Sequence, residues 1–482
     1  MDAAKSAFPS LRGMKSVILI SAPYRDLYGP IKAAAGYYFP LGLGYIASVL
    51  IKHGYDVRLC EPDAQRMGYE DIERMLAHER PDIVGIGSAT PNFHNAVEIA
   101  RLAKAHGAVV VLGGIHASSL PSHIAGQYGE FFDYVVCGEG EFSILELVRE
   151  LEAGRVPLNV KGLSFLHEGR VITTPLRPHI ENLDSLPYPA RELLPQDIFR
   201  PNLHNQRYKR CFTILTSRGC PFRCSFCASR KALGSIYRTH SADYVLGEME
   251  YLKKLYGAEQ LVITDDTFTL DRNRLIAICE GMIRHNLNLK WFCFSQVTAV
   301  DKDILKLMKR AGCYNIGFGV ESASLRILSL MKKPIRPEKC AEVIAAASGL
   351  GIKTQAFFVL GIEESLEELR QTVDFAVRLK PTFSFFNMLV PYPGTEEFER
   401  FFADVPLSSM DWKDFVAVGV NAVVRNSNFN LRKEIFRANM RFYARPSQLF
   451  RIARHIRTRL EFWNHLKGGL ALLRQMRLWR RA

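Results

Sequence analysis

The chain has 482 residues, of which 48% are hydrophobic and 23% charged, a composition typical of a soluble globular protein with about three domains. It lacks the apolar run of about 18 residues that a membrane-spanning helix needs, and no apolar segment of a secretory signal precedes the first predicted strand. The net charge of +14 comes mostly from residues 431–482, which hold 14 Lys or Arg and two acids, so it argues against a nucleic-acid-binding body.

Residues 1–150 alternate apolar runs with amphipathic segments, which predicts a doubly wound, Rossmann-like parallel sheet. Strands that are buried on both faces are apolar throughout, and the short runs of this region fit that description. We expect strands at residues 17–21, 56–59, 82–87, 108–112 and 133–136, and helices at 41–53, 69–78 and 92–106.

Residues 151–205 contain seven prolines, which interrupt regular elements. Residues 163–167 and 170–173 are compatible with a small hairpin across Glu168-Gly169. We interpret the whole stretch as a Pro-rich linker that packs along the surface between two domains.

Residues 206–404 repeat the strand–helix pattern six times, which predicts a partial (β/α)6, TIM-like barrel with its ligands at the carboxyl ends of the strands. Residues 405–482 are rich in arginine and predict a basic helical C-terminal region. Expected barrel strands are residues 212–216, 260–263, 291–295, 315–319, 354–359 and 383–389, with helices at 242–255, 272–285, 302–311, 337–349 and 366–379.

Three of the ten cysteines, Cys220, Cys224 and Cys227, fall within eight residues, directly after the first predicted barrel strand. The others are scattered, a pattern typical of a cytoplasmic protein without disulfides. Thiolates are the usual ligands of a 4Fe–4S cluster, and three of them leave one iron open to a further ligand. A structural zinc site is the alternative, but zinc prefers four ligands, and Cys211 lies too far away, at the start of the strand.

The C-x3-C-x2-C spacing, with an aromatic residue before the last cysteine, resembles the radical S-adenosylmethionine (SAM) superfamily. This resemblance implies that the open iron chelates the amino and carboxyl groups of SAM. Electron transfer to SAM then cleaves its sulfonium and yields a 5′-deoxyadenosyl radical. The resemblance also implies an external electron donor of the flavodoxin or ferredoxin type.

Segments after the later strands resemble the same superfamily in their order and spacing. Many of its members carry an arginine after the third strand, where this chain has Ser295-Gln296-Val297, which leaves open what neutralises the SAM carboxylate. The SAM-binding residues that the resemblance implies are Phe226, Asp265, Asp266, Ser295, Glu321 and Gly361.

Loops with glycine and hydroxyl residues follow the strands of the first domain, where a doubly wound sheet binds its ligand. None is a G-x-G-x-x-G fingerprint, which argues against a dinucleotide. The loops resemble the cobalamin-binding domain that precedes some radical SAM barrels, although no Asp-x-His-x-x-Gly motif supplies an axial histidine. A domain that binds nothing is the alternative. The cobalamin-binding residues implied are Ser88, Thr90, Gly113, Gly114, His116, Gly138 and Glu139.

Apolar residues recur at helical spacing from Leu449 to Leu473, and arginines lie between them. A helix packed over the barrel with solvated arginines explains this pattern. Peripheral contact with an anionic membrane surface is a second explanation, and nucleic-acid binding is a third.

The cysteine pattern predicts a cytoplasmic enzyme, and the basic tail leaves peripheral contact at the inner membrane surface open. The resemblance as a whole implies that the enzyme uses a 4Fe–4S cluster, SAM and cobalamin. Its expected reaction is methylation of an unactivated carbon in a small or lipid-like substrate. A radical oxidative cyclase or ring-rearranging enzyme is the alternative. Methylthio transfer to transfer RNA would need a second cysteine triad, which Cys60 and Cys137 do not make. A cobalamin sensor with a vestigial barrel would predict a broken triad, and this one is intact. No residue stands out as a general acid or base.

Overall fold

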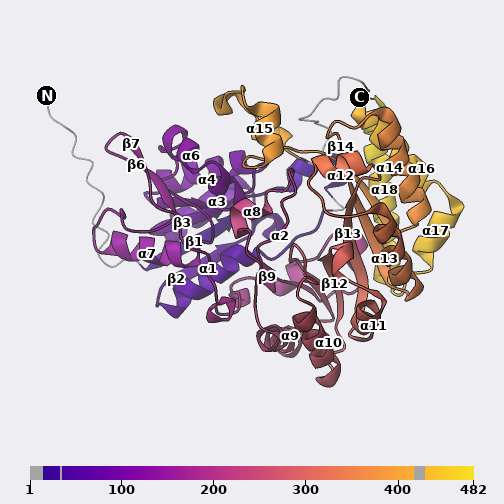
Figure 1. The fold of residues 1–482 in the computed structure, drawn as a ribbon. Helices are drawn as coiled ribbons and strands as arrows, with labels where there is room; N and C mark the ends of the chain where they lie inside the picture. Colours follow the sequence, from indigo (N-terminus) through magenta and orange to yellow (C-terminus); the bar gives the residue numbers. More distant parts are fainter. Residues whose placement is uncertain (1–14, 33–34, 417–428, 482) are drawn as a thin grey trace.

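The computed structural model describes residues 15–32, 35–416 and 429–481 (Figure 1). Its first domain is built on a seven-stranded sheet of order β2-β1-β3-β4-β5-β6-β7, in which the first five strands in chain order run parallel. The five predicted strands are confirmed, as β1 (Ser16–Ser21), β2 (Asp56–Cys60), β3 (Ile83–Gly87), β4 (Val109–Gly113) and β5 (Tyr134–Val136).

Helices cover both faces of this sheet, because successive strand residues point to opposite sides. Val17 and Leu19 of β1 pack in one core with α1 (Leu41–Lys52) and α7 (Glu141–Glu152). Ile18 and Ile20 pack in the other core, with α3 (Tyr69–Glu79), α4 (Phe93–Ala105) and α6 (Pro121–Gln127). The doubly wound prediction is therefore confirmed.

The sheet continues beyond residue 150, into the segment predicted as a linker. The expected hairpin forms as β6 (Leu163–His167) and β7 (Arg170–Thr173), turning at Glu168 and Gly169, which both have positive φ. β6 pairs antiparallel with β5 and buries Leu163 and Phe165 in the first core, so the hairpin belongs to the first domain. Short 3-10 turns from Leu183 to Asn205 then lead to the second domain.

The second domain is a six-stranded parallel sheet of order β15-β14-β13-β12-β11-β8, in which every strand lies beside its neighbour in the chain. All six predicted strands are confirmed. Since β8 and β15 are its unpaired edges, the barrel is partial and open on one side. The strands are β8 (Cys211–Ile214), β11 (Gln260–Ile263), β12 (Lys290–Ser295), β13 (Cys313–Glu321), β14 (Lys353–Leu360) and β15 (Phe383–Met388).

Helices cover the outside of this sheet and bury one large apolar core (Figure 1). The five predicted helices match their ranges closely, because their ends carry recognisable caps: Ser365, for example, forms a capping box with Glu368. The short helix α12 was not predicted. The helices are α9 (Ala242–Tyr256), α10 (Arg272–Arg284), α11 (Lys302–Arg310), α12 (Leu325–Leu330), α13 (Pro337–Gly349) and α14 (Leu366–Leu379).

The predicted basic helical region contains α16 (Leu431–Tyr443), α17 (Pro446–Ala453) and α18 (Arg459–Arg481). Residues 417–428 of that prediction lie outside the described residues, as does the start of the chain, residues 1–14. α18 bridges both edges of the barrel: the Asn464 side chain donates to the Gln206 carbonyl at 3.3 Å, before β8, and His465 packs on Phe383 of β15. No helix among the described residues has the length and apolarity to cross a bilayer.

Candidate active site

The three clustered cysteines lie in the loop between β9 (Ser217–Arg218) and α8 (Ser229–Leu233), just beyond the carboxyl end of β8. Cys220, Cys224 and Cys227 are partly exposed, whereas the other seven cysteines are buried. The Cys227 N–H donates to the Cys224 carbonyl at 3.2 Å, which forms a tight turn between the last two cysteines. The loop therefore offers three accessible thiols at the barrel mouth.

The thiols fit a cubane cluster by the chemistry of the donor set. Among the described residues, no three His, Cys, Asp or Glu side chains converge closely enough to bind one metal ion. The cysteines of a cubane bind three different irons, so they need not converge. Three thiols in one loop suit a 4Fe–4S cluster with one open iron, whereas a closed structural zinc site takes four ligands.

Gly219, which precedes the first ligand, fixes the course of the loop. Its φ is +84°, and a Cβ there would lie 2.1 Å from the Ile236 carbonyl oxygen. Only glycine combines this backbone conformation with such a close approach. The loop is thereby held against the segment that leads into β10 (Arg238–Thr239).

A buried ion pair, between Lys333 and Glu321 at 2.9 Å, lies beside the cysteines. Burial raises the pKa of the Cys224 thiol to about 11, and the positive charge of Lys333 opposes that rise. Burial acts to lower the pKa of Lys333, but Glu321 and the thiols raise it overall. The cation therefore favours the thiolate, which is the form that binds iron.

Glu321, an expected SAM-binding residue, ends β13 in an unusual conformation. Its φ is +60°, and the ladder between β13 and β14 shifts register between Gly319 and Glu321. A Cβ on Gly319 would lie 2.4 Å from the Glu321 carboxylate, so the glycine makes room for the ion pair. The bulge turns the Glu321 side chain toward Lys333. The Glu321 carboxylate is therefore already paired with Lys333.

The two expected aspartates occupy different environments. Asp265 is fully buried and accepts hydrogen bonds from the Thr216 N–H and hydroxyl, both at 2.6 Å, and from the Ser217 hydroxyl at 2.5 Å. Asp266 is exposed and accepts a hydrogen bond from the Ser229 hydroxyl at 2.9 Å. Asp265 therefore ties β8 to β11, and Asp266 is the one open to a ligand.

The remaining expected SAM residues line other strand ends. Ser295 is buried and its hydroxyl lies 2.6 Å from that of Thr269, while Phe226 packs on a small apolar cluster with Ile362. Gly361 has φ +110°, which suits glycine. Gln296, at the position of the missing arginine, is buried and its amide oxygen has no hydrogen-bond partner. A buried acceptor without a partner is unfavourable unless a ligand satisfies it.

In the first domain, the expected cobalamin loops meet at the carboxyl ends of β3, β4 and β5. The buried hydroxyl of Ser88 has no hydrogen-bond partner, and a Cβ on Gly113 or Gly138 would meet no atom within 4 Å. Gly114 instead approaches the Ser88 carbonyl, which its added Cβ would reach at 2.3 Å. An unsatisfied hydroxyl beside open space at two glycines fits a ligand at this edge.

His116 lies deeper than its loop position suggests. It is fully buried, its Nδ1 is 3.2 Å from the Thr90 hydroxyl, and its ring packs against Phe93 and Trp412. Burial lowers the pKa of His116 to about 3, so the ring is neutral. Its Nε2 has no hydrogen-bond partner.

Glu139, also expected at the cobalamin site, forms ion pairs with the second domain. It lies 2.9 Å from both Arg218, which directly precedes the cluster loop, and Arg238 of β10. Glu141 pairs with the same Arg218 at 2.7 Å. All four side chains are buried, so the loop after β5 is tied to the cysteine loop.

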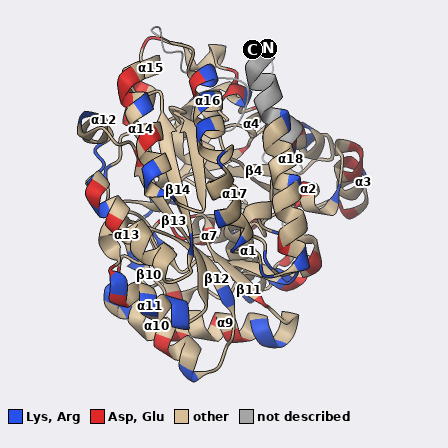
Figure 2. Cartoon of the chain, turned by 90° about the vertical axis from the view of Figure 1, so that its right-hand side faces the viewer, with Lys and Arg blue, Asp and Glu red and all other residues tan. Residues whose placement is uncertain are grey.

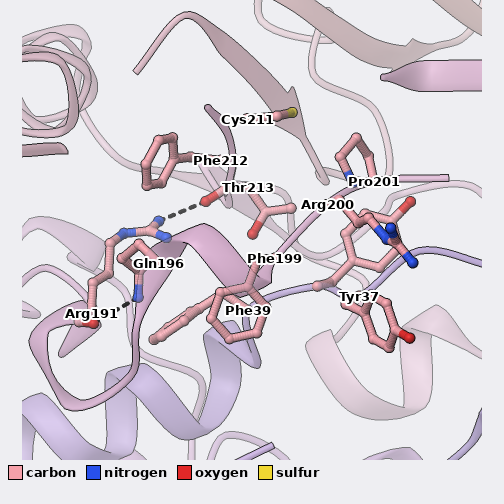
Figure 3. Close-up of a pocket in the computed structure, with 11 residues that line it drawn as sticks. Tyr37, Phe39, Arg191, Gln196, Phe199, Arg200, Pro201, Cys211, Phe212 and Thr213 are labelled. Atoms are coloured by element: carbon pink, nitrogen blue, oxygen red, sulfur yellow. Dashed lines mark hydrogen bonds between the residues drawn. The ribbon is translucent and has the colours of Figure 1, made fainter. Parts of the chain in front are cut away.

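The enclosed space in Figure 3 is too small to be the active site. It measures about 10 Å³, room for one water at most, and lies between Tyr37–Phe39 and β8, where Arg191 donates to the Thr213 carbonyl at 2.6 Å. A surface hollow of about 390 Å³ lies at the opposite end of the barrel from the cysteines, beside Lys253 and Lys290. Neither adjoins the cluster loop.

Comparison with known proteins shows the family. Residues 214–376 match the radical SAM superfamily, and residues 30–148 match the B12 binding domain. An uncharacterised methyltransferase of Pyrococcus horikoshii is 34% identical over 418 residues, covering 86% of this chain and 89% of that protein. This chain belongs to the cobalamin-binding radical SAM family. Its cofactors are therefore a 4Fe–4S cluster, SAM and cobalamin.

A further relative and one solved structure are also similar to this chain. An anaerobic magnesium-protoporphyrin IX monomethyl ester cyclase of Rubrivivax gelatinosus is 29% identical, covering 79% of this chain and 70% of that one. The structure of the radical SAM methyltransferase TsrM from Kitasatospora setae has the same fold, with a TM-score of 0.70 at 19% identity, covering 97% of this chain and 99% of that chain.

Three residues of the site were not found by sequence reasoning. Lys333 follows a short helix, and no local pattern marks it as a neighbour of the cysteines. Arg218 and Arg238 flank the cluster loop, and their partners lie in another domain. The one available signal was the pair of acids in the loop Gly138-Glu139-Gly140-Glu141, whose arginine partners lie in the second domain.

Proposed function

We propose that this radical SAM enzyme methylates an unactivated carbon of a small or lipid-like substrate that binds between the two domains. The observation that carries the proposal is the buried contact of Glu139 and Glu141 with Arg218. This contact joins the carboxyl end of the first sheet to the loop that carries Cys220. A substrate between these ends can meet both cofactors. The name of the Pyrococcus relative, a methyltransferase, supports the same reaction.

When bound, the cluster and SAM supply a radical that removes hydrogen from carbon, and cobalamin supplies the methyl group. The chain's part is to hold these groups and exclude water. Cys220, Cys224 and Cys227 hold the cluster, with Lys333 favouring their thiolates. An external donor of the flavodoxin or ferredoxin type supplies the electron.

SAM binds, in this proposal, along the carboxyl ends of the barrel strands. Asp266 and the amide oxygen of Gln296 are the open acceptors for its amino group. Asp265 and Ser295 hold the strand ends in place, and Glu321 acts through Lys333. Phe226 and Gly361 flank the adenine.

Cobalamin binds over the ends of β3, β4 and β5. The hydroxyl of Ser88 and the open space at Gly113 and Gly138 receive its polar edge. Gly114 fixes the conformation of the loop, and the Thr90 hydroxyl positions the His116 ring. Trp412 packs on that ring, so His116 contacts the nucleotide tail of cobalamin only after Trp412 moves. Glu139 acts as a positioning residue rather than a ligand.

Anaerobic turnover of the reconstituted enzyme with SAM, methylcobalamin and a strong reductant tests the reaction by mass spectrometry. Methyl transfer predicts 5′-deoxyadenosine together with S-adenosylhomocysteine, and formation of the latter should depend on cobalamin. Cys224→Ala should abolish deoxyadenosine, whereas Cys340→Ala, which removes a buried thiol of α13, should not. Deoxyadenosine from the Cys224→Ala variant would contradict the site.

A radical oxidative cyclase is the second candidate, favoured by the likeness to the Rubrivivax cyclase. It uses the same cluster and SAM but transfers no methyl group. Deoxyadenosine without S-adenosylhomocysteine, in the presence of cobalamin, would therefore favour the cyclase and reject methyl transfer.

A further inference from the structure

The last two helices expose several large apolar side chains. On α18 they recur every three or four residues, so they share one side of the helix. Soluble monomers rarely expose so many large apolar side chains together without a partner. The set, here called the apolar stripe, consists of Leu449 (57% exposed), Phe450 (71%), Phe462 (51%), Trp463 (55%), Leu466 (46%), Leu470 (51%) and Leu473 (53%).

The opposite side of α18 is anchored to the barrel. Glu461 is buried and pairs with Lys353 and Arg207, and Asn464 and Ala471 are also buried. The side of α18 that faces the barrel is therefore mainly polar. Rotating the helix to bury the stripe would also bury its cations and would leave Lys353 without its carboxylate partner. The stripe is a fixed outward feature of the fold.

Cations surround the stripe almost without acids. Residues 446–481 contain nine Lys or Arg and one acid, Glu461. The Glu461 carboxylate is buried and paired with Lys353. Arg454, Arg457, Lys467 and Arg474 are exposed among the apolar residues. Figure 2 looks onto this side, where α17 and α18 lie in front and carry Lys and Arg.

We propose that the outer face of α17 and α18 docks on an anionic lipid surface. Exposed apolar side chains flanked by cations suit the boundary between acyl chains and anionic headgroups. A second copy of the chain would bring two strongly cationic faces together, which like-charge repulsion opposes. Because no described helix can cross a bilayer, the helices lie on the surface.

α18 also crosses the amino end of the barrel, where it contacts Gln206 before β8 and Phe383 at the start of β15. The docking itself does not depend on the proposed methyl transfer, because it needs neither cofactor nor turnover.

Flotation of the full chain with vesicles tests the proposal. The protein should float with vesicles of mixed phosphatidylcholine and phosphatidylglycerol, and much less with phosphatidylcholine alone or at high salt. The double variant Leu466→Ser with Leu470→Ser should weaken the partitioning by about tenfold or more. Arg454→Gln or Lys467→Gln should weaken it by about fivefold each.

Leu255→Ser is the matched control, because Leu255 is 62% exposed on α9, away from the stripe. This variant should float like the parent chain. Absence of flotation with anionic vesicles would overturn the proposal, as would equal weakening by Leu255→Ser. A parent chain that is dimeric in light scattering and becomes monomeric in the Leu466→Ser, Leu470→Ser variant would overturn it in favour of a second copy.

Discussion

Arg218 and Glu139 form a buried salt bridge of 2.9 Å although 79 residues separate them in the chain. One residue precedes the cluster loop of the barrel, and the other follows the last parallel strand of the cobalamin domain. Arg218 also lies over the ring of Tyr45, 5.1 Å from its centroid. The relative placement of the two cofactor sites therefore depends on a few buried charges.

Glu139→Gln should lower the free energy of unfolding by about 2–4 kcal/mol, because Arg238 loses its buried counter-charge and Arg218 keeps only Glu141. Glu146→Gln is the control: Glu146 also pairs with an arginine, Arg177, but is 43% exposed, so the loss should stay below about 1 kcal/mol. Chemical denaturation measures both. Equal losses would show that the buried pair contributes no more than a surface pair.

Gly219→Ala should prevent the cluster loop from closing, because the new methyl group would collide with the Ile236 carbonyl. We expect loss of most bound iron after anaerobic reconstitution. Gly154→Ala is the control that separates backbone strain from steric collision. Gly154 also has a positive φ, +66°, but a Cβ added there meets no atom within 4 Å. That control should cost about 1–2 kcal/mol of stability and keep its iron. Full iron content in Gly219→Ala would contradict the assignment.

Because Glu61 is buried, we expect the free energy of unfolding to depend on pH. Glu61 follows β2, is 1% exposed, and has one carboxylate oxygen without a partner. Burial raises the pKa of Glu61 to about 8, against about 4.3 in an unfolded chain. The folded state therefore holds the proton over this interval, and its stability falls as pH rises from about 4.3 to about 8.

Glu61→Gln has no proton to lose, so the stability of the variant should match that of the parent near pH 4. It should exceed the parent's increasingly toward pH 8, by at most about 1.4 kcal/mol per pH unit. Denaturation curves across that range measure the difference. Glu98→Gln is the control, because Arg101 lowers the pKa of Glu98 and its charge is constant over the window. A Glu61→Gln difference that does not change with pH would show that Glu61 is ionised in the fold.

Asn205 joins three strands at the amino end of the barrel. Its side-chain oxygen accepts from the amides of Asn315 at 3.0 Å and Gln355 at 2.5 Å, and its carbonyl accepts from Gln260 at 2.6 Å. Asn205→Ala should cost about 2–4 kcal/mol in denaturation, because two buried amides lose their acceptor. Adding Gln355→Leu should recover part of that loss. No recovery would mean that the cost comes from a cavity instead.

Local pattern predicted the elements of this fold well. The range 366–379 for α14 agrees with the structure at both ends, because Ser365 caps its start and the apolar residues recur at helical spacing. The cysteine spacing predicted one loop with three clustered thiols, and Cys220, Cys224 and Cys227 do lie in one loop, all partly exposed. Such signals are contained in a few neighbouring residues.

Contacts between distant segments were not predictable in this way. The pairing of β6 with β5 moved the predicted hairpin into the first domain, and no sequence period identifies a strand's partner. Asp265 lies at a motif position where the resemblance implies contact with SAM, but its carboxylate accepts hydrogen bonds from Thr216 and Ser217. The loop position of His116 gave no sign that Trp412, nearly 300 residues later, covers it.

The bridging position of α18 has a consequence for the capacity of the barrel. A closed barrel fixes its circumference through an unbroken ladder of backbone hydrogen bonds. Here the last interval of the circumference is spanned by side chains, Asn464 at one edge and His465 at the other. A small tilt of this single helix would change the interior width without breaking one strand pair. Changes in this terminal helix would therefore alter the size of ligand that the barrel admits and leave the catalytic sheet as it is.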